Sequence, residues 1–274
     1  MKRDSGQEEK GRLREIHANR FFVETERVSV GTGADDTGNI IITGEDVRHI
    51  RDVLRMRRGD RLVLCDGQGN DWLCEISQID KSSITTGIIS CSRSVGEPPV
   101  EIVLYQGLPR GDKFDFVIQK CVEVGVTRIV PIICERTQFG ADLRQGDKGV
   151  KKLQRWRRIA LEAAKQSGRG KVPRVEDIAL FQEAVTGMSK KSLAIIPYEK
   201  ELKRTLVSVL RGGERQDTHI FIGPEGGFSE QEVSCATGAG AIPVTLGPRI
   251  LRTETAGIAV VFAITYEASA DSVI

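Results

Sequence analysis

Two loops near the C-terminal end of the chain combine residue types that can carry out chemistry. Residues 246–256 read Leu-Gly-Pro-Arg-Ile-Leu-Arg-Thr-Glu-Thr-Ala and include the guanidinium group of Arg252 and the carboxylate of Glu254. Residues 223–228 read Gly-Pro-Glu-Gly-Gly-Phe and carry a second carboxylate, Glu225. A positioned carboxylate can accept a proton, and a positioned cation can stabilise negative charge that develops on oxygen. The two loops therefore hold charged groups that could take part in acid–base chemistry.

Each loop follows a short apolar segment that is typical of a buried strand, at residues 220–222 and 242–246. Gly and Pro in each loop predict a turn. Ser229 and Glu232 form a Ser-x-x-Glu capping box, which predicts that a helix begins after the first loop. The helix after the second loop is apolar on almost every side, which predicts that it is buried. Two such strand–loop–helix units predict a ligand crevice at the carboxyl ends of the strands of an α/β sheet.

Taken alone, the loop at residues 223–227 is also compatible with a purely structural turn. It is not a Walker A loop, because no Gly-Lys-Ser/Thr follows it. It is not the Gly-x-Gly-x-x-Gly dinucleotide fingerprint either. Only the joint occurrence of the two loops favours a ligand site.

Composition argues against several classes of protein. The 274 residues are 39% hydrophobic and 28% charged, which is normal for a soluble globular protein. No segment approaches the ~20 consecutive apolar residues of a membrane-spanning helix, and the polar N-terminus predicts no signal peptide. The six cysteines include no Cys-x-x-Cys pair and the three histidines are isolated, which predicts reduced thiols and no metal site. These observations predict a cytoplasmic protein that binds neither a membrane nor a metal.

The first third of the chain has a different pattern from the remainder. Residues 1–19 are polar and charged without apolar periodicity, which predicts a disordered tail. Residues 20–95 contain short strand-like runs and a hairpin turn at residues 66–70, which predict a small β-barrel. A helix is expected at residues 44–54, with the apolar side chains of Val47, Ile50 and Leu54 on one face. Residues 96–99 predict a linker, because consecutive prolines continue neither a strand nor a helix. The predicted strands are residues 39–43, 61–65, 71–76 and 83–89.

Residues 100–274 alternate between strand-like and helix-like segments. This alternation predicts the α/β class, with a mainly parallel sheet and helices on both of its faces. One helix, at residues 113–124, is expected to end at Gly125, and another is expected at residues 150–166. The predicted strands are residues 100–105, 127–133, 192–196, 219–222 and 242–246.

Basic residues are concentrated in two places. Between Arg144 and Arg174 the chain has eleven Lys and Arg residues and two acidic residues. A second group accompanies the helix at residues 44–54 and comprises Arg48, Arg51, Arg55, Arg57 and Arg58. Such groups can neutralise phosphates, and phosphate contacts dominate affinity for nucleic acids. The alternative for both groups is a basic helix surface that only faces solvent.

Residues 222–229 and 246–256 together resemble the RsmE family of the SPOUT superfamily. Members of this family are S-adenosylmethionine-dependent methyltransferases that modify uridine N3 in 16S ribosomal RNA. Further matching motifs lie at residues 49–54, 59–60, 107–115, 119–126, 135–137 and 163–169, so the resemblance covers residues 20 to 268. One departure is Lys165, which stands where a Glu is expected before Gln-Ser-Gly-Arg.

The resemblance implies a fold, a cofactor and partners. It implies an α/β domain with a deep trefoil knot at residues 100–274, preceded by a PUA-like, RNA-binding β-barrel at residues 20–95. It also implies a homodimer that acts on 16S ribosomal RNA or the 30S subunit. In the superfamily, three loops of the knot clasp S-adenosyl-L-methionine. The corresponding residues are Ile196, Pro197, Ile222, Gly223, Pro224, Glu225, Gly226, Leu246, Gly247, Ile250 and Leu251.

The family's target atom places a demand on the site. Uridine N3 carries a proton in the neutral base, and this proton must leave before or during attack on the methyl group. Arg252 is expected to stabilise negative charge on the uracil carbonyl oxygens, and Glu225 or Glu254 is expected to accept the proton. The structural alternatives are an ion pair for Arg252, a loop-stabilising hydrogen bond for Glu225, and an interaction of Glu254 with the helix dipole.

RNA binding is assigned to cationic and amide side chains. These are Arg55, Arg57, Lys113, Arg136, Lys165, Gln166 and Arg169. Arg169 is expected to reach the target nucleotide, and the alternative for the residues of the second domain is a salt bridge at the edge of the sheet. Two other functions stay open, namely a SPOUT methyltransferase for another RNA site such as a ribose 2′-oxygen, and a non-catalytic RNA-binding protein.

Overall fold

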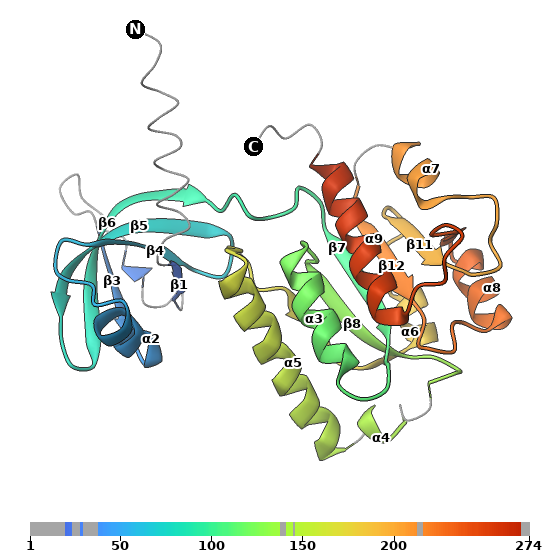
Figure 1. Cartoon of the computed structure of the whole chain (residues 1–274), viewed down its shortest axis with the longest axis horizontal. Coiled ribbons are helices and arrows are strands. Elements are labelled where there is room, and N and C mark those ends of the chain that lie inside the picture. Colours follow the sequence, from blue (N-terminus) through green and yellow to red (C-terminus); the bar gives the residue numbers. More distant parts are fainter. Residues whose placement is uncertain are drawn as a thin grey trace, which may run out of the picture. The chain divides into compact units, whose positions relative to one another are not determined.

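The computed structural model of the chain describes residues 20–23, 28–29, 38–137, 141–144, 146–212 and 216–269. The tail predicted at residues 1–19 lies outside these residues. The chain divides into two compact units (Figure 1). The first comprises Met1–Glu97 and Gly168–Val172, and the second comprises Pro98–Ser167 and Pro173–Ile274. The short segment Gly168–Val172 thus groups with the first unit, and the division at residues 20–95, 96–99 and 100–274 stays a prediction.

The first unit is built on a six-stranded sheet with the order β1-β4-β5-β6-β3-β2. Strand β1 pairs with β4 in parallel, and the other neighbours are antiparallel. The four predicted strands are confirmed. The predicted hairpin turn also exists, because Asp66 Oδ1 accepts hydrogen bonds from the backbone N–H groups of Gln68 and Asn70 between β4 and β5. The bounds are β1 Arg20–Phe22, β2 Val28–Ser29, β3 Asn39–Thr43, β4 Arg61–Cys65, β5 Asn70–Ile79 and β6 Ser83–Arg93.

Among the described residues of the first unit, one short helical segment packs on this sheet. It begins as α2, Glu45–Arg48, and continues as a π-helical turn, η2, His49–Val53. Val47 and Ile50 are buried as predicted, but Leu54 is 38% exposed, so its predicted place on the buried face is wrong. The wider π-helical turn changes the angular spacing of side chains, which rotates Leu54 out of the apolar stripe.

The second unit is built on a parallel sheet with the order β10-β8-β7-β12-β11-β13, and β9 pairs with β8 beside this path. Every strand pair in it is parallel, as predicted. The bounds are β7 Ile102–Gly107, β8 Arg128–Ile133, β9 Arg174–Val175, β10 Ala179–Leu180, β11 Leu193–Pro197, β12 Thr218–Ile222 and β13 Ile242–Val244.

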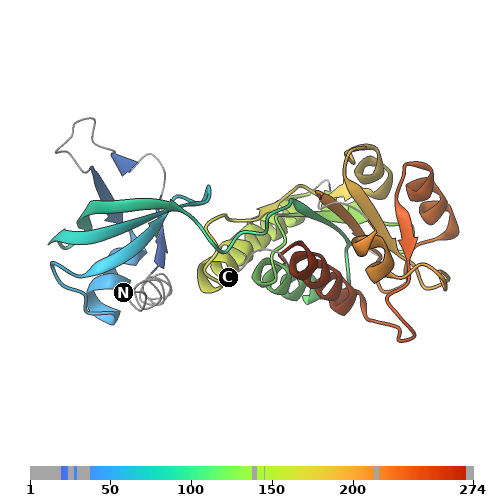
Figure 2. The ribbon, with the colours of Figure 1, turned by 90° about the horizontal axis from the view of Figure 1, so that it is seen from above.

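Helices cover both faces of this sheet, as predicted (Figure 2). Because successive side chains of a strand point to opposite faces, Val103 and Tyr105 of β7 join a core with side chains of α6 and α8. Leu104 and Gln106 lie on the other face, against Gly257 of α9. The bounds are α3 Lys113–Glu123, α4 Ala141–Arg144, α5 Asp147–Gln166, α6 Phe181–Thr186, α7 Leu206–Arg211, α8 Glu230–Gly238 and α9 Thr253–Ala268.

The predicted end of α3 and the predicted start of α8 are both confirmed. Gly125 follows α3 with a φ of 110°, a conformation that glycine adopts at low energetic cost. Ser229 and Glu232 form a reciprocal capping box at the start of α8, in which each side chain accepts a hydrogen bond from the other residue's backbone N–H group. Helix α8 therefore begins directly after the Gly-rich loop.

Helix α9 differs from the prediction that it is buried on all sides. Val260 and Ile264 are buried, whereas Phe262 is 54% exposed and Tyr266 is 68% exposed. These two rings stack on each other, with centroids 6.0 Å apart. An apolar helix predicts burial of its whole surface, but within the described residues of this single chain no element covers the outer face.

All six cysteines are free thiols, and four of them are buried. Cys65, Cys74, Cys121 and Cys134 are buried, and Cys91 and Cys235 are exposed. Burial raises the pKa of the Cys74 thiol to about 11, which makes it unreactive at neutral pH. In the described part of the chain, no group of three or more His, Cys, Asp and Glu could hold a metal ion. Among those residues there is likewise no helix of the length and apolarity needed to cross a membrane.

Candidate cofactor and substrate site

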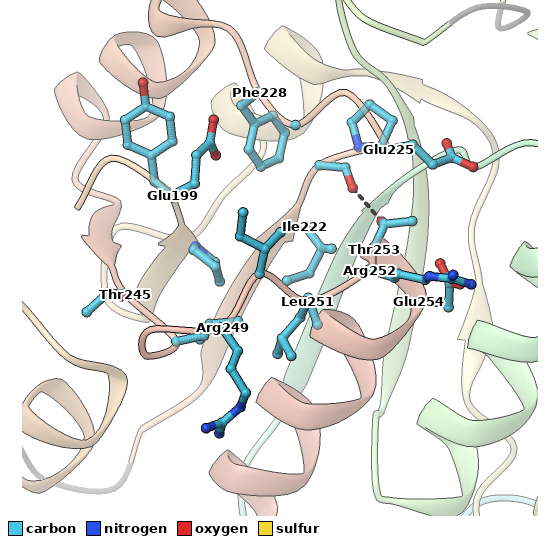
Figure 3. Close-up of a pocket in the computed structure, with 18 of the residues that line it drawn as sticks. Glu199, Ile222, Glu225, Phe228, Thr245, Arg249, Leu251, Arg252, Thr253 and Glu254 are labelled. Atoms are coloured by element: carbon cyan, nitrogen blue, oxygen red, sulfur yellow. Dashed lines mark hydrogen bonds between the residues drawn. The ribbon is translucent and has the colours of Figure 1, made fainter. Parts of the chain in front are cut away.

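A pocket of about 600 Å³ lies at the carboxyl ends of β11, β12 and β13 in the second unit (Figure 3). The loops that follow these three strands supply most of its wall, as the strand–loop–helix pattern predicts. It is lined by Lys113, Leu202, Phe228, residues 197–199, 222–227 and 245–254, and Ala256.

The pocket brings together most of the residues that were predicted to bind the cofactor. The lining includes Pro197, Ile222, Gly223, Pro224, Glu225, Gly226, Leu246, Gly247, Ile250 and Leu251. Ile196 is the exception, because it is fully buried within β11 and does not line the pocket. Arg252, Glu225 and Glu254 also line the pocket, so the three predicted catalytic side chains share one cavity.

The loop after β12 approaches the end of β7 closely. A Cβ atom on Gly107 would lie 2.5 Å from the backbone nitrogen of Pro224 and 2.7 Å from its Cδ. Both neighbours belong to a rigid proline, so only glycine allows this approach at residue 107. Gly107 does not itself line the pocket. Its lack of a side chain allows Pro224 to take its position in the pocket wall.

Thr253, the first residue of α9, connects three elements at the wall of the pocket. Its hydroxyl group donates a hydrogen bond to the carbonyl oxygen of Gly223, with an O···O distance of 2.5 Å. The same oxygen accepts a hydrogen bond from Gln106 Nε2 at 2.8 Å. Gln106 is fully buried. Neither residue was predicted to have a role, although a polar residue in the apolar run of residues 102–106 was a signal for one.

Glu225 is held by its neighbours. Its Oε1 accepts hydrogen bonds from Lys113 Nζ at 2.8 Å and from the backbone N–H of Arg110 at 3.0 Å. Partial burial alone would raise the pKa of this carboxyl group, but hydrogen bonds from Lys113 and from the backbone N–H groups of Glu225 and Arg110 outweigh it and lower the pKa. These contacts correspond to the structural alternative for Glu225, a hydrogen bond that stabilises the loop.

Arg252 and Glu254 flank Thr253 at the start of α9. Arg252 is exposed and makes no salt bridge within 4.0 Å among the described residues, so the alternative of an ion pair is not observed. Glu254 lies in the first turn of α9, where a negative charge favours the helix dipole. Its Oε2 is enclosed and has no hydrogen-bond partner among the residues that the structure describes. In Figure 3 both side chains lie toward the same end of the pocket as Glu225, away from Arg249.

A second cavity of about 800 Å³ adjoins the first. The two cavities share Lys113, Pro224, Glu225 and Gly226 as lining residues. The rest of the second lining consists of Leu108, Arg110, Glu135, Arg136 and Thr137. Two of the residues assigned to RNA, Lys113 and Arg136, thus lie beside the predicted catalytic groups.

The other residues assigned to RNA line neither cavity. Arg55 and Arg57 are exposed after η2 in the first unit, and Arg55 has a φ of 54°, which is uncommon for a residue other than glycine. Gln166 is exposed in the last turn of α5, and Lys165 beside it is partly buried with its Nζ 3.9 Å from Glu162 Oε1.

Arg169 does not occupy the place expected for a residue that reaches the target nucleotide. It is 2% exposed, and its Nη2 lies 2.7 Å from Glu97 Oε2 within the first unit. Glu97 Oε1 also accepts hydrogen bonds from the backbone N–H groups of Gly170 and Lys171. Arg169 thus forms a salt bridge, which was the structural alternative to RNA binding. It does so because the segment Gly168–Val172, which contains Arg169, groups with the first unit, to which Glu97 also belongs.

Comparison with known proteins identifies the family. Residues 96–265 match the RNA methyltransferase domain, and residues 42–89 match the RNA methyltransferase PUA domain. Ribosomal RNA small subunit methyltransferase E of Bacillus subtilis is 35% identical over 255 residues, which is 90% of this chain and 96% of that protein. The chain belongs to the RsmE family.

Solved structures of relatives agree with the fold. The ribosomal RNA small subunit methyltransferase E of Neisseria gonorrhoeae, bound to S-adenosyl methionine, superposes with a TM-score of 0.75 and 33% identity, covering 90% of this chain and 97% of that one. A methyltransferase of Legionella pneumophila in complex with the same cofactor has a TM-score of 0.71 and 30% identity, covering 90% and 96%. The predicted α/β class and PUA-like first domain of this RsmE-family chain are confirmed, and its trefoil knot stays a prediction.

Proposed function

We propose that this chain transfers a methyl group from S-adenosyl-L-methionine to N3 of a uridine in the 16S ribosomal RNA of the small subunit. The observation that carries the proposal is that one pocket, at the carboxyl ends of three parallel strands, gathers Arg252, Glu225 and Glu254. The RsmE-family relatives in Bacillus subtilis and Neisseria gonorrhoeae support the reaction class and the RNA, and two solved relatives support the cofactor.

The pocket suits the cofactor in size and in chemistry. Its volume of about 600 Å³ lies in the range of small-molecule sites. Ile222 and Leu251 supply apolar wall for an adenosyl group, and Glu199 supplies a carboxylate for a cation. The glycines at positions 223, 226 and 227 leave loop backbone accessible along the wall. When bound, S-adenosyl-L-methionine supplies a methyl group on a positively charged sulfur.

The side chains of this protein position the acceptor and remove its proton. Positioning of the two reactants is worth up to ~7–11 kcal/mol in favourable cases. Arg252 stabilises the negative charge that spreads over the uracil carbonyl oxygens as N3 loses its proton. The absence of an ion pair for Arg252 among the described residues leaves its donors available for this task.

Glu254 is the better supported proton acceptor of the two carboxylates. Glu225 is occupied by Lys113 and by the backbone of Arg110, and its pKa is lowered, so it is a weak base. Glu254 has an oxygen without a hydrogen bond among the described residues. The proton of N3 passes to Glu254, and Glu225 fixes the wall of the pocket.

The protein binds RNA with basic surfaces and acts as a cytoplasmic homodimer. The basic helix α5 and the arginines after η2, Arg55 and Arg57, contact phosphates. The exposed rings of Phe262 and Tyr266 on α9, and the exposed Phe116 on α3, support a dimer, because an apolar face of this kind favours burial against a second copy. On this proposal residues 20–95 form the RNA-binding domain, residues 96–99 link it, and residues 100–274 form the knotted methyltransferase domain.

Nucleoside mass spectrometry of ribosomal RNA from a deletion strain tests the proposal. Loss of 3-methyluridine from 16S ribosomal RNA, restored by the wild-type gene, is the expected result. An unchanged 3-methyluridine level together with loss of a ribose-methylated nucleoside would assign the chain to another RNA site. Calorimetry with S-adenosyl-L-methionine separates both enzymes from a non-catalytic RNA-binding protein, which would take up no cofactor.

A further inference from the structure

The second cavity, which we call the basic cleft, is lined by Lys113 and Arg136, which the sequence assigned to RNA, but the proposed function gives the cavity itself no ligand. It occupies about 800 Å³ beside the cofactor pocket, and both cavities lie within the second unit. Lys113 and the loop residues Pro224, Glu225 and Gly226 form the wall between them. A group that fills the basic cleft is therefore separated from the cofactor pocket by a single layer of protein.

Three cationic side chains reach the basic cleft from three places in the fold. Arg110 comes from the loop after β7, Lys113 is the first residue of α3, and Arg136 follows β8. Two carboxylates, Glu135 and Glu225, line the same cleft. The lining therefore carries an excess of one positive charge.

The charge of Glu225 is already compensated within the wall. Its Oε1 accepts hydrogen bonds from Lys113 Nζ at 2.8 Å and from the backbone N–H of Arg110 at 3.0 Å. Lys113 is thus engaged with Glu225, whereas the guanidinium group of Arg110 makes no salt bridge within 4.0 Å among the described residues. Arg110 and Arg136 are the groups left to meet an incoming anion.

Arg136 is fixed at the shared wall. Its Nη1 donates a hydrogen bond to the carbonyl oxygen of Gly226 at 2.6 Å. A Cβ atom on Gly226 would lie 3.2 Å from Arg136 Cβ and 3.3 Å from its Cδ, so the glycine leaves room for the arginine stem to pack on the loop. One of the five N–H donors of the guanidinium group is used in this contact, which leaves others for a ligand.

We infer that the basic cleft binds a phosphodiester group of the RNA next to the target nucleotide, through the guanidinium groups of Arg110 and Arg136. Phosphate is the anion that the planar donor fork of arginine matches best. Because Lys113, Pro224, Glu225 and Gly226 line both cavities, a phosphate held there lies next to the cofactor pocket. This inference rests on the proposed function, because it assigns part of the same RNA substrate.

The salt dependence of RNA binding tests the inference. The affinity of the full-length protein for 16S ribosomal RNA would be measured over a series of KCl concentrations for the wild type, Arg110→Ala and Arg136→Ala. Each substitution is expected to weaken RNA binding about tenfold at low salt and to reduce the slope of log affinity against log salt by about 1, the loss expected for one phosphate contact. The affinity for S-adenosyl-L-methionine is expected to stay at the wild-type value in Arg110→Ala, because only the backbone N–H of Arg110 contacts Glu225 and the substitution keeps it.

Two further variants serve as controls. Arg211→Ala removes an exposed arginine of α7 that lines neither cavity. The slope of its log RNA affinity against log salt concentration is expected to equal that of the wild type. Arg136→Lys keeps the charge and is expected to keep most of the slope. Thermal unfolding of each variant confirms that it is folded.

An unchanged slope in both Arg110→Ala and Arg136→Ala, with a wild type that binds and methylates the RNA, would overturn the inference and leave the proposed function standing. Loss of cofactor affinity in folded Arg110→Ala would also overturn it, because the cleft would then belong to the cofactor site. A wild type that takes up no cofactor would refute the proposed function itself.

Discussion

The hydroxyl group of Thr253 donates a hydrogen bond to the carbonyl oxygen of Gly223, across a distance of 2.5 Å. Because Gln106 Nε2 donates to the same hydroxyl oxygen at 2.8 Å, one side-chain atom connects β7, the loop after β12 and the start of α9. Thr253 and Gln106 are both buried. The relative positions of Arg252, Glu254 and the Gly-rich loop therefore depend on this single oxygen.

Thr253→Val tests this dependence. Valine has nearly the same shape but leaves the Gly223 carbonyl and the Gln106 amide short of a partner, and a buried polar group left unsatisfied costs about 1–3 kcal/mol. The free energy of unfolding is expected to fall by that amount, and affinity for S-adenosyl-L-methionine is expected to fall with it. Denaturant unfolding and calorimetry measure the two quantities. Thr253→Ser keeps the hydroxyl group and should restore cofactor affinity, whereas equal behaviour of the valine variant and the wild type would refute the role.

Gly107→Ala is expected to open the pocket wall. The new Cβ atom would lie 2.5 Å from the nitrogen of Pro224, so backbone must move, and forced overpacking of this kind typically costs about 1–3 kcal/mol. Weaker cofactor binding and a lower free energy of unfolding are the expected results. Gly238→Ala in α8 is the matched control, because a Cβ atom there meets nothing within 4 Å and should leave both quantities unchanged or slightly raise stability. If Gly107→Ala matched Gly238→Ala, the close approach would have no consequence for the site.

Arg252→Ala separates catalysis from cofactor binding. Arg252 is an exposed residue at the mouth of the pocket, and the proposed contact with the uracil oxygens forms fully only as N3 becomes negatively charged. Turnover is expected to fall by about 10²–10³, as for other lost donors to a developing oxyanion, while the dissociation constant for S-adenosyl-L-methionine stays near that of the wild type. Single-turnover kinetics and calorimetry give the two values. A large loss of cofactor affinity with turnover intact would contradict the assignment.

His219 makes stability depend on pH. Burial lowers the pKa of His219 below its ordinary value, and Arg128 lowers it further, against weaker opposing effects of Glu101 and Asp217. As the pH falls below about 6.5, His219 takes up a proton in the unfolded chain but not yet in the folded chain. The stabilisation that is present above this pH is therefore lost as the pH falls below it. One proton limits this slope to about 1.4 kcal/mol per pH unit.

His219→Gln removes this proton and is expected to flatten the pH dependence. Denaturant unfolding at several pH values between 7.5 and 5.5 would give the free energy of unfolding of the wild type and of the variant. The contribution of His219 is the difference between the slopes of these two free energies against pH. In the folded wild type, Tyr105 Oη lies 3.0 Å from His219 Nδ1, so the variant also loses this contact at every pH. Parallel curves for the two proteins would show that another group is responsible.

Features that depend on neighbouring residues could be predicted from the sequence. The capping box of Ser229 and Glu232, the end of α3 at Gly125 and the strands of the parallel sheet follow from local preference and from periodicity, and all are confirmed. The two Gly/Pro loops were expected at one crevice because strand ends of a parallel sheet share an edge, and they line one pocket.

Features that depend on partners distant in sequence could not be predicted. No pattern indicates that Glu97 pairs with Arg169, 72 residues later, or that Arg110 and Lys113 hold Glu225. The exposed outer face of α9 could not be predicted either. Apolar composition predicts that a helix is buried, but it does not identify the surface that covers each face. The role of Thr253 requires knowing that Gln106 and Gly223 meet it in space.

Transfer of a labelled methyl group to RNA is the most direct test of the central claim. Purified protein would be incubated with S-adenosyl-L-methionine carrying a labelled methyl group and with 30S subunits or 16S ribosomal RNA from the deletion strain, followed by nucleoside mass spectrometry. The account predicts label in 3-methyluridine, at a rate that Arg252→Ala lowers by orders of magnitude. Label on a ribose 2′-oxygen, or no transfer by a protein that binds the cofactor, would contradict it.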